Sequence, residues 1–159
     1  MQQTTQPRLH LGWAWPAGAF VLVLAATLLP KIRVGVAAPL AALLIGAGAA
    51  WWARSTAPSS LGRSAAAGAV TGIGALLASM VAFTILGFAF GSSPEIQEFV
   101  RTSEPDPEAR IPYPWIAPLG AVFGVLVGLG FGLLNLVLAT IGGVLVGLRG
   151  EPTPAPRPA

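Results

Sequence analysis

The chain has 159 residues, of which 54% are hydrophobic and 9% are charged. A soluble domain carries roughly a quarter charged residues because its surface faces water, so this composition excludes an ordinary soluble globule and indicates an integral membrane protein. The net charge is +3, but the basic residues are spread over separate short segments, which argues against a nucleic-acid partner. The absence of cysteine excludes disulfides and thiolate metal sites. A single lysine beside abundant alanine, glycine and arginine is typical of a GC-rich bacterial genome.

Four long uncharged stretches follow one another along the chain and predict four membrane-spanning helices. About 20 residues are needed to cross a hydrocarbon core of about 30 Å, and each stretch has them. Short connections make consecutive helices antiparallel neighbours. The predicted fold is an all-α, four-helix transmembrane bundle that occupies residues 1–159, with spans at about 11–30, 34–53, 64–90 and 116–148. Residues 149–159 form a Pro-rich tail that we expect to be disordered.

One longer hydrophilic loop, 91–115, connects the third and fourth predicted spans. It is rich in proline and holds five of the six acidic residues of the chain. Ile96, Phe99 and Val100 have the i, i+3, i+4 spacing of one helix face. We therefore expect residues 94–102 to form a short helix on the membrane surface.

The fourth predicted span is longer than a bilayer requires. As one straight helix, residues 116–148 would extend about 50 Å, against a hydrocarbon core of about 30 Å. The helix therefore has to tilt, break or protrude, and the pair Gly142-Gly143 is its expected weak point. No polar turn divides the stretch near Asn135, so we predict one helix.

The distribution of basic residues orients the predicted bundle. With four spans, both termini and the middle loop lie on one side, which carries five basic residues, and the other side carries four. Because basic residues are enriched in cytoplasmic segments, we place both termini in the cytoplasm and the acidic loop 91–115 outside the cell membrane. Lys31 and Arg33, which fall in the first external turn, oppose this assignment.

Small residues recur at four-residue spacing in the predicted spans, and in a membrane such stripes allow close contact between helix backbones. The longest stripe, on the fourth span, is Gly120, Gly124, Gly128 and Gly132, and shorter stripes contain Gly68 and Gly72 in the third span and Gly46 in the second. Packing between helices of one chain is the more common role of such stripes. The alternative is that the long stripe docks onto a partner subunit, a second copy of the chain or a cofactor tail.

The predicted spans contain no Asp, Glu, Lys, Arg or His, whereas proton-coupled transporters generally need such a group in the membrane. The small multidrug-resistance family, which is similar in length and helix number, depends on a glutamate in its first helix, and this sequence has none there. The notable polar residue is Asn135, whose amide is costly in hydrocarbon unless it is paired. We interpret Asn135 as a contact between helices, with a contact in a pore or a cofactor pocket as the alternative.

His10 is the only histidine, and it precedes the first span near Trp13 and Trp15. It is a weak candidate for axial ligation of a haem or a pigment. A solvated histidine at the membrane surface is favoured, because no other ligand-like residue accompanies it. We predict no catalytic residue, no metal site and no bound cofactor, because no catalytic or metal-ligand motif is present.

The sequence therefore predicts a small integral membrane protein that is not an enzyme. The favoured function is an accessory or scaffold subunit that packs against a larger membrane complex through its glycine-striped helices, and a respiratory or photosynthetic complex is a compatible host. The alternative is a passive channel or facilitator formed as a homo-oligomer. The expected partners are membrane lipids and other membrane subunits or a second copy of the chain.

Overall fold

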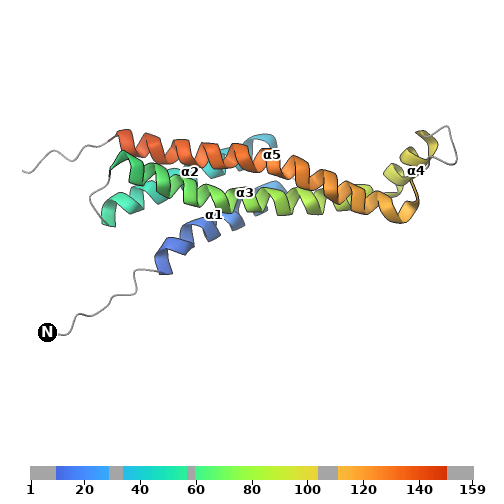
Figure 1. The fold of residues 1–159 in the computed structure, drawn as a ribbon, viewed down its shortest axis with the longest axis horizontal. Coiled ribbons are helices and arrows are strands. Elements are labelled where there is room, and N and C mark those ends of the chain that lie inside the picture. The colour runs from blue at the N-terminus through green and yellow to red at the C-terminus, as the bar shows by residue number, and fades with distance from the viewer. Residues whose placement is uncertain (1–9, 29–33, 57–59, 104–110, 150–159) are drawn as a thin grey trace, which may run out of the picture.

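The computed structural model describes residues 10–28, 34–56, 60–103 and 111–149. Within these ranges the chain is helical and contains no strand. The described residues form five helices, labelled in Figure 1, which are α1 (His10–Leu28), α2 (Val34–Thr56), α3 (Leu61–Gly91), α4 (Pro94–Ser103) and α5 (Tyr113–Leu148). The Pro-rich tail predicted after Leu148 lies, apart from Arg149, outside the described residues.

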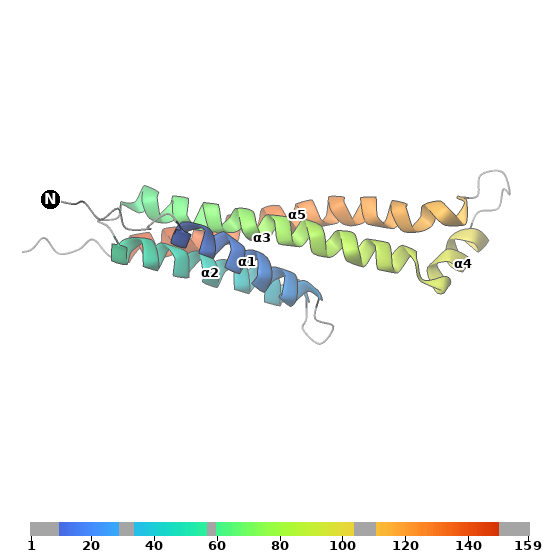
Figure 2. The same ribbon diagram turned by 90° about the horizontal axis from the view of Figure 1, so that it is seen from below.

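Two long antiparallel helices, α3 and α5, run the length of the molecule. They have 31 and 36 residues, which correspond to about 46 and 54 Å. Figures 1 and 2 show them side by side along their whole length, with α4 at the end where they connect. The shorter helices α1 and α2, of 19 and 23 residues, lie against only one half of this pair, the half that contains the start of α3 and the end of α5.

Among the residues that the structure describes, three helices are long and apolar enough to cross a membrane, namely α3, α5 and the segment Val36–Ser55 of α2. The apolar part of α1, Trp13–Leu28, is shorter. The all-helical prediction is therefore confirmed for the described residues, and the three long apolar helices are compatible with a multi-pass membrane protein. The length and composition of α1 do not establish the first predicted span, 11–30, as a membrane crossing.

Local hydrogen bonds and a proline mark both ends of α3 and the start of α4. Ser60 caps the start of α3, because its hydroxyl accepts a hydrogen bond from the backbone N–H of Arg63 at 3.3 Å. At the other end, the backbone N–H and the hydroxyl of Ser92 both donate to the Phe88 carbonyl, at 2.9 and 2.8 Å. Pro94 then opens α4 at a position where a missing N–H is tolerated. The short helix predicted at 94–102 is thus confirmed as a helix.

The last helix, α5, is continuous through the glycine pair that the sequence marks as a weak point. Gly142 lies against the Leu43 carbonyl of α2, and a Cβ added at Gly143 would come within 2.5 Å of the Ser64 carbonyl oxygen of α3. Neighbouring helices therefore enclose this turn from two sides. The pair serves close helix packing here and introduces no break.

The packed core lies between α1, α2 and α3 and is built mainly of alanine. Its buried members are Ala19, Val23, Ala38, Ala42, Ala75 and Ala78, with Phe20, Leu24, Ala26 and Ile45 packed against them. Because alanine extends little beyond the backbone, the helices approach one another closely. This core fixes α1 and α2 on one half of the α3–α5 pair.

Candidate functional site

The long glycine stripe of α5 faces α3. A Cβ added at Gly128 would come within 2.8 Å of the Met80 Cα, and one at Gly132 within 2.9 Å of the Leu76 carbonyl oxygen. Gly124 lies directly against the Phe83 carbonyl. Real Cβ atoms essentially never approach other atoms so closely. These positions therefore require glycine for the observed contact between α3 and α5.

The same contact continues at both ends of the stripe. Gly120 of α5 meets Gly87 of α3, and a Cβ added at Gly72 of α3 would lie 2.9 Å from the Leu136 Cα of α5. The α3–α5 seam, which we define as the facing residues Ser64 to Gly91 and Ile116 to Gly147, thus joins the two helices along nearly their full length. The glycine stripe of α5, for which docking onto a partner was the alternative prediction, is therefore occupied by α3 of the same chain.

Ala139 marks the point where three helices meet. Its backbone lies against Gly46 of α2 and Gly68 of α3, and its methyl group would be 3.3 Å from a Cβ added at Gly72. Ala139 itself is fully buried. The shorter stripes of the second and third predicted spans therefore converge on one residue of α5, and this junction holds α2 against the long pair.

Asn135 lies in the seam and is buried, with 1% of its surface exposed. Its Nδ2 donates a hydrogen bond to the Ser79 hydroxyl at 2.9 Å, and that hydroxyl donates to the Ala75 carbonyl at 2.9 Å. The Asn135 Oδ1 is buried without a hydrogen-bond partner. Asn135 thus joins α5 to α3, at the penalty of one unsatisfied carbonyl, typically about 1–3 kcal/mol.

Four threonine hydroxyls of α1, α3 and α5 bond within their own helix, whereas the Ser64 hydroxyl of α3 is buried without a hydrogen-bond partner. The hydroxyls of Thr27, Thr71, Thr84 and Thr140 each donate to the carbonyl four residues earlier, at 2.6–2.8 Å. A hydroxyl that bonds in this way leaves no donor for a ligand. His10, the weak candidate ligand, is the first residue of α1, and its side chain lies outside the described part of the structure.

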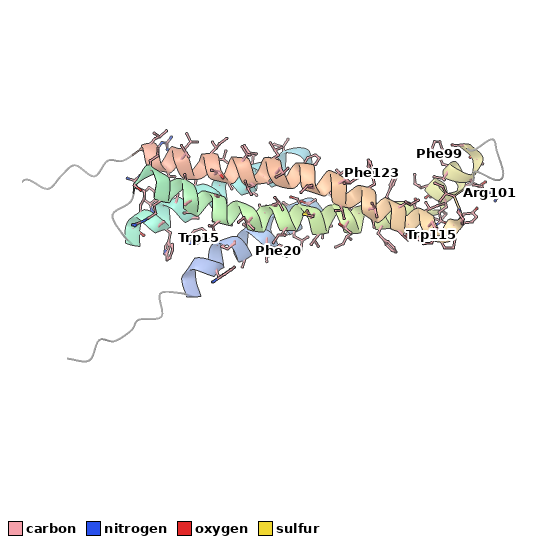
Figure 3. All side chains as sticks on the ribbon, in the orientation of Figure 1. Trp15, Phe20, Phe99, Arg101, Trp115 and Phe123 are labelled. Atoms are coloured by element: carbon pink, nitrogen blue, oxygen red, sulfur yellow. The ribbon has the colours of Figure 1, made fainter. Side chains whose placement is uncertain are left out.

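One half of the α3–α5 pair is covered by neither α1 nor α2, and the short helix α4 lies only at its tip. We call this part the outer hairpin and define it as residues 83–91 of α3 and 113–131 of α5. Its large apolar side chains are exposed, and they are Ile85, Leu86, Phe88, Phe90, Trp115, Leu119, Val122, Phe123, Leu126, Leu129 and Phe131. Figure 3 shows Phe123 projecting outward from α5. The stripe side of the hairpin is packed, and its remaining faces are open.

The tip of the outer hairpin carries the short helix α4. The Gln97 Nε2 donates to the Gly91 carbonyl at 3.5 Å, and the Arg101 Nη1 donates to the Tyr113 hydroxyl at 3.4 Å. Arg101 also pairs with Glu98 at 3.6 Å. The Tyr113 hydroxyl, and after it the Glu98 carboxylate, raises the pKa of Arg101 above its usual value. These contacts tie α4 to the ends of both long helices.

The opposite end of the molecule gathers arginines and tryptophans. The rings of Trp15 in α1 and Trp52 in α2 lie 6.4 Å apart between centroids. Arg54 of α2 donates from its Nη1 to the Val146 carbonyl near the end of α5, which satisfies one of the terminal carbonyls of that helix. In the sequence, the sign of a structured site at this end is the nearness of Arg54 to the Trp51-Trp52 pair.

Among the described residues, no group of three or more His, Asp or Glu side chains is placed to hold a metal ion. Together, the fold and these sites define a class, that of small helical proteins with long apolar helices suited to a membrane. Comparison with protein-family models, with curated proteins and with solved structures found no match. The function therefore has to be argued from the geometry of the chain itself.

Proposed function

We propose that the protein is a non-catalytic integral membrane subunit that packs against a larger membrane complex. The observation that carries this proposal is the outer hairpin, whose apolar side chains are exposed and whose helices contain no Asp, Glu, Lys, Arg or His within residues 64–91 and 113–148. Contiguous apolar surface on this scale marks a contact with protein or with lipid. A respiratory or photosynthetic complex is a host compatible with such a subunit.

The length of the hairpin favours protein over lipid as its cover. An upright α5 of about 54 Å exceeds a hydrocarbon core of about 30 Å by roughly 24 Å. Even at a tilt of about 40°, the upper end of the usual range, α5 spans about 41 Å of membrane thickness. Uncharged helix therefore extends beyond the hydrocarbon in either arrangement. A partner subunit that reaches out of the bilayer would cover this part, whereas lipid tails would not.

The glycine-striped helices contribute to this docking in a specific way. Since Gly124 and Gly128 face α3, the stripe holds the hairpin together, and the outward faces of α3 and α5 contact the partner. The partner surface then includes Phe123 and Leu126 of α5, which are both exposed. Rigid packing along the seam presents these side chains in a fixed arrangement, which lowers the entropy lost on docking.

Isolation from native membranes in mild detergent tests this proposal. We expect the protein to co-purify with larger proteins at a fixed stoichiometry. We further expect Phe123→Ser to weaken that association and Leu44→Ser not to, because both side chains are 67% exposed but only Phe123 belongs to the outer hairpin. Purification as a homogeneous monomer or homo-oligomer without other proteins would contradict the proposal.

The orientation that belongs to this proposal places both termini in the cytoplasm and α4 outside. The chain has no cysteine, so a single Ser103→Cys variant at the end of α4 carries the only thiol. We expect a membrane-impermeant thiol reagent to label it in intact cells. Labelling that occurs only after lysis would invert the orientation.

The alternative function is a passive channel or facilitator formed as a homo-oligomer. A pathway along α5 would use its outward face, since the stripe faces α3. Gly130 lies on that face, where an added Cβ would meet nothing within 4 Å, beside a hollow of about 330 Å³ lined in part by Leu126 and Leu134. Solute flux into liposomes that falls in the Gly130→Leu variant would favour this alternative, and unchanged flux would remove that face from any pathway.

A further inference from the structure

A groove opens between α1, α2 and α3 at the arginine-rich end of the molecule. Its volume is about 280 Å³, close to the lower end of the range of about 300–1,000 Å³ that small-molecule pockets occupy. We call it the Arg63 groove, and its lining residues are Trp15, Ala49, Trp52, Ala53, Arg63, Ala66, Ala67, Val70 and Thr71. Figures 1 and 3 show α1 leaning away from the other helices toward its N-terminus, with Trp15 on the side that faces them.

The walls of the Arg63 groove are apolar along their length. The alanine side chains of α2 and α3 are too small to fill the groove, and the indole rings of Trp15 and Trp52 border it. Thr71 is the uncharged polar residue of the lining, and its hydroxyl already donates to the Ala67 carbonyl at 2.8 Å. The walls therefore suit a hydrocarbon chain and offer little to a polar solute.

Arg63 places a positive charge at one end of this apolar groove. Arg63 lies in the first turn of α3, where the helix dipole disfavours a cation by about 0.3–1 kcal/mol. The dipole of α3 therefore does not account for an arginine at this position. A guanidinium presents several N–H donors in a plane that matches phosphate oxygens. Indole rings beside it are typical of the headgroup level of a bilayer.

We propose that the Arg63 groove binds one anionic phospholipid. The phosphate and its anionic headgroup lie at Arg63, and the first part of one acyl chain lies beside the two indoles and along Ala66 and Val70. From Arg63 to Val70 the helix advances about 10 Å, or two turns, so the groove accommodates the upper segment of the chain and the remainder lies in the bilayer. Basic pockets between membrane helices recognise anionic headgroups by this combination of charge and apolar contact.

Lipid titration of the full-length protein in a non-ionic detergent, read by native mass spectrometry, tests the site. We expect phosphatidylglycerol to bind about tenfold more tightly than phosphatidylcholine, which corresponds to about 1.4 kcal/mol. Arg63→Gln should abolish this preference. Ala66→Leu, which fills the groove without changing its charge, should lower the binding of both lipids at this site several-fold.

Two matched variants and one competitor complete the experiment. Arg101→Gln removes an arginine at the other end of the molecule, and Ala89→Leu enlarges an exposed alanine of α3 that does not line the groove. Both should bind lipid as the wild type does. Inorganic phosphate should not displace the lipid, because phosphate alone makes no apolar contact.

Three results would overturn the proposal. They are equal binding of the two lipids by the wild type, wild-type binding by Ala66→Leu, and displacement of the lipid by inorganic phosphate, which would assign the site to a free anion. Should Arg63→Gln fail to fold, the lipid preference of the wild type and the Ala66→Leu variant still decide the matter.

Discussion

Gly124 shows how strictly the contact between α3 and α5 limits side-chain size. It lies against the Phe83 carbonyl, whereas Gly130, six positions later on the same helix, has open space where a Cβ would be. The two glycines have the same intrinsic helix propensity, so a comparison of them isolates the effect of packing. Alanine improves helix propensity at either position by about 1 kcal/mol.

We predict that Gly124→Ala lowers the free energy of unfolding in detergent by roughly 1–3 kcal/mol, the usual effect of overpacking. Gly130→Ala should leave it unchanged or raise it slightly. Thermal unfolding followed by circular dichroism provides the measurement. Equal stability of the two variants would contradict the close packing of α5 against α3 at Gly124.

Asn135 and Ser79 form the polar contact between the long helices, at 2.9 Å. We predict a coupling free energy of about 0.6 kcal/mol, and at most about 1.7, as measured for hydrogen bonds between membrane helices. A double-mutant cycle with Asn135→Leu and Ser79→Ala in unfolding measurements gives this value. Additive effects of the two substitutions would show that the hydrogen bond does not form.

Several residue roles were predictable from the sequence, and others were not. The spacing of the α5 glycines identified a close-packing face, but a periodic stripe does not specify which helix it faces. The hydroxyls of Thr27 and Thr71 bond to their own helix, which is a general preference of such residues because the acceptor is always present four residues earlier. The partner of Asn135 depends on the register between α3 and α5, which no local pattern encodes.

At the scale of the elements, the register of α3 against α5 is the quantity to test. Phe83 of α3 and Phe131 of α5 stack with ring centroids 4.9 Å apart. Leu145 lies fourteen residues after Phe131, about 21 Å away along α5. The absence of native cysteine makes paired cysteine variants at these positions easy to interpret.

We predict that a Phe83→Cys, Phe131→Cys double variant cross-links efficiently with a short bifunctional thiol reagent. The control pair, Phe83→Cys with Leu145→Cys, should not cross-link, because the end of α5 packs against the start of α3, far from Phe83. Electrophoresis after proteolysis between α3 and α5 separates linked from unlinked chains. Preferential linking of the control pair would contradict this register.

The ends of the helices were less predictable than their existence. Hydrophobicity placed the start of the third helix at residue 64, but the hydroxyl of Ser60 caps α3 and begins it at Leu61. Similarly, α5 begins at Tyr113 because Pro112 and Pro114 are compatible with a first helical turn. Such capping contacts depend on single hydrogen bonds, to which an average over a long apolar window is insensitive.

At the scale of the whole molecule, the helices form a pair of long helices, α3 and α5, with the two shorter helices α1 and α2 on one half of it. The lengths of the apolar stretches indicated that the third and fourth helices were overlong. Where α1 and α2 would lie along them was not predictable, because it depends on which small residues meet. Gly74 contacts Pro16 of α1, and Gly46 contacts Ala139, and together these contacts select one half of the pair.

The central claim is that a partner protein covers the outer hairpin, and site-specific photo-cross-linking in native membranes tests it most directly. A photoreactive amino acid replaces Phe123 on the hairpin or, as the control, Leu44 on α2, since both side chains are 67% exposed. We predict that position 123 gives an adduct with one larger protein and that position 44 gives none. The absence of a protein adduct at position 123, or equal adducts at both positions, would contradict the claim.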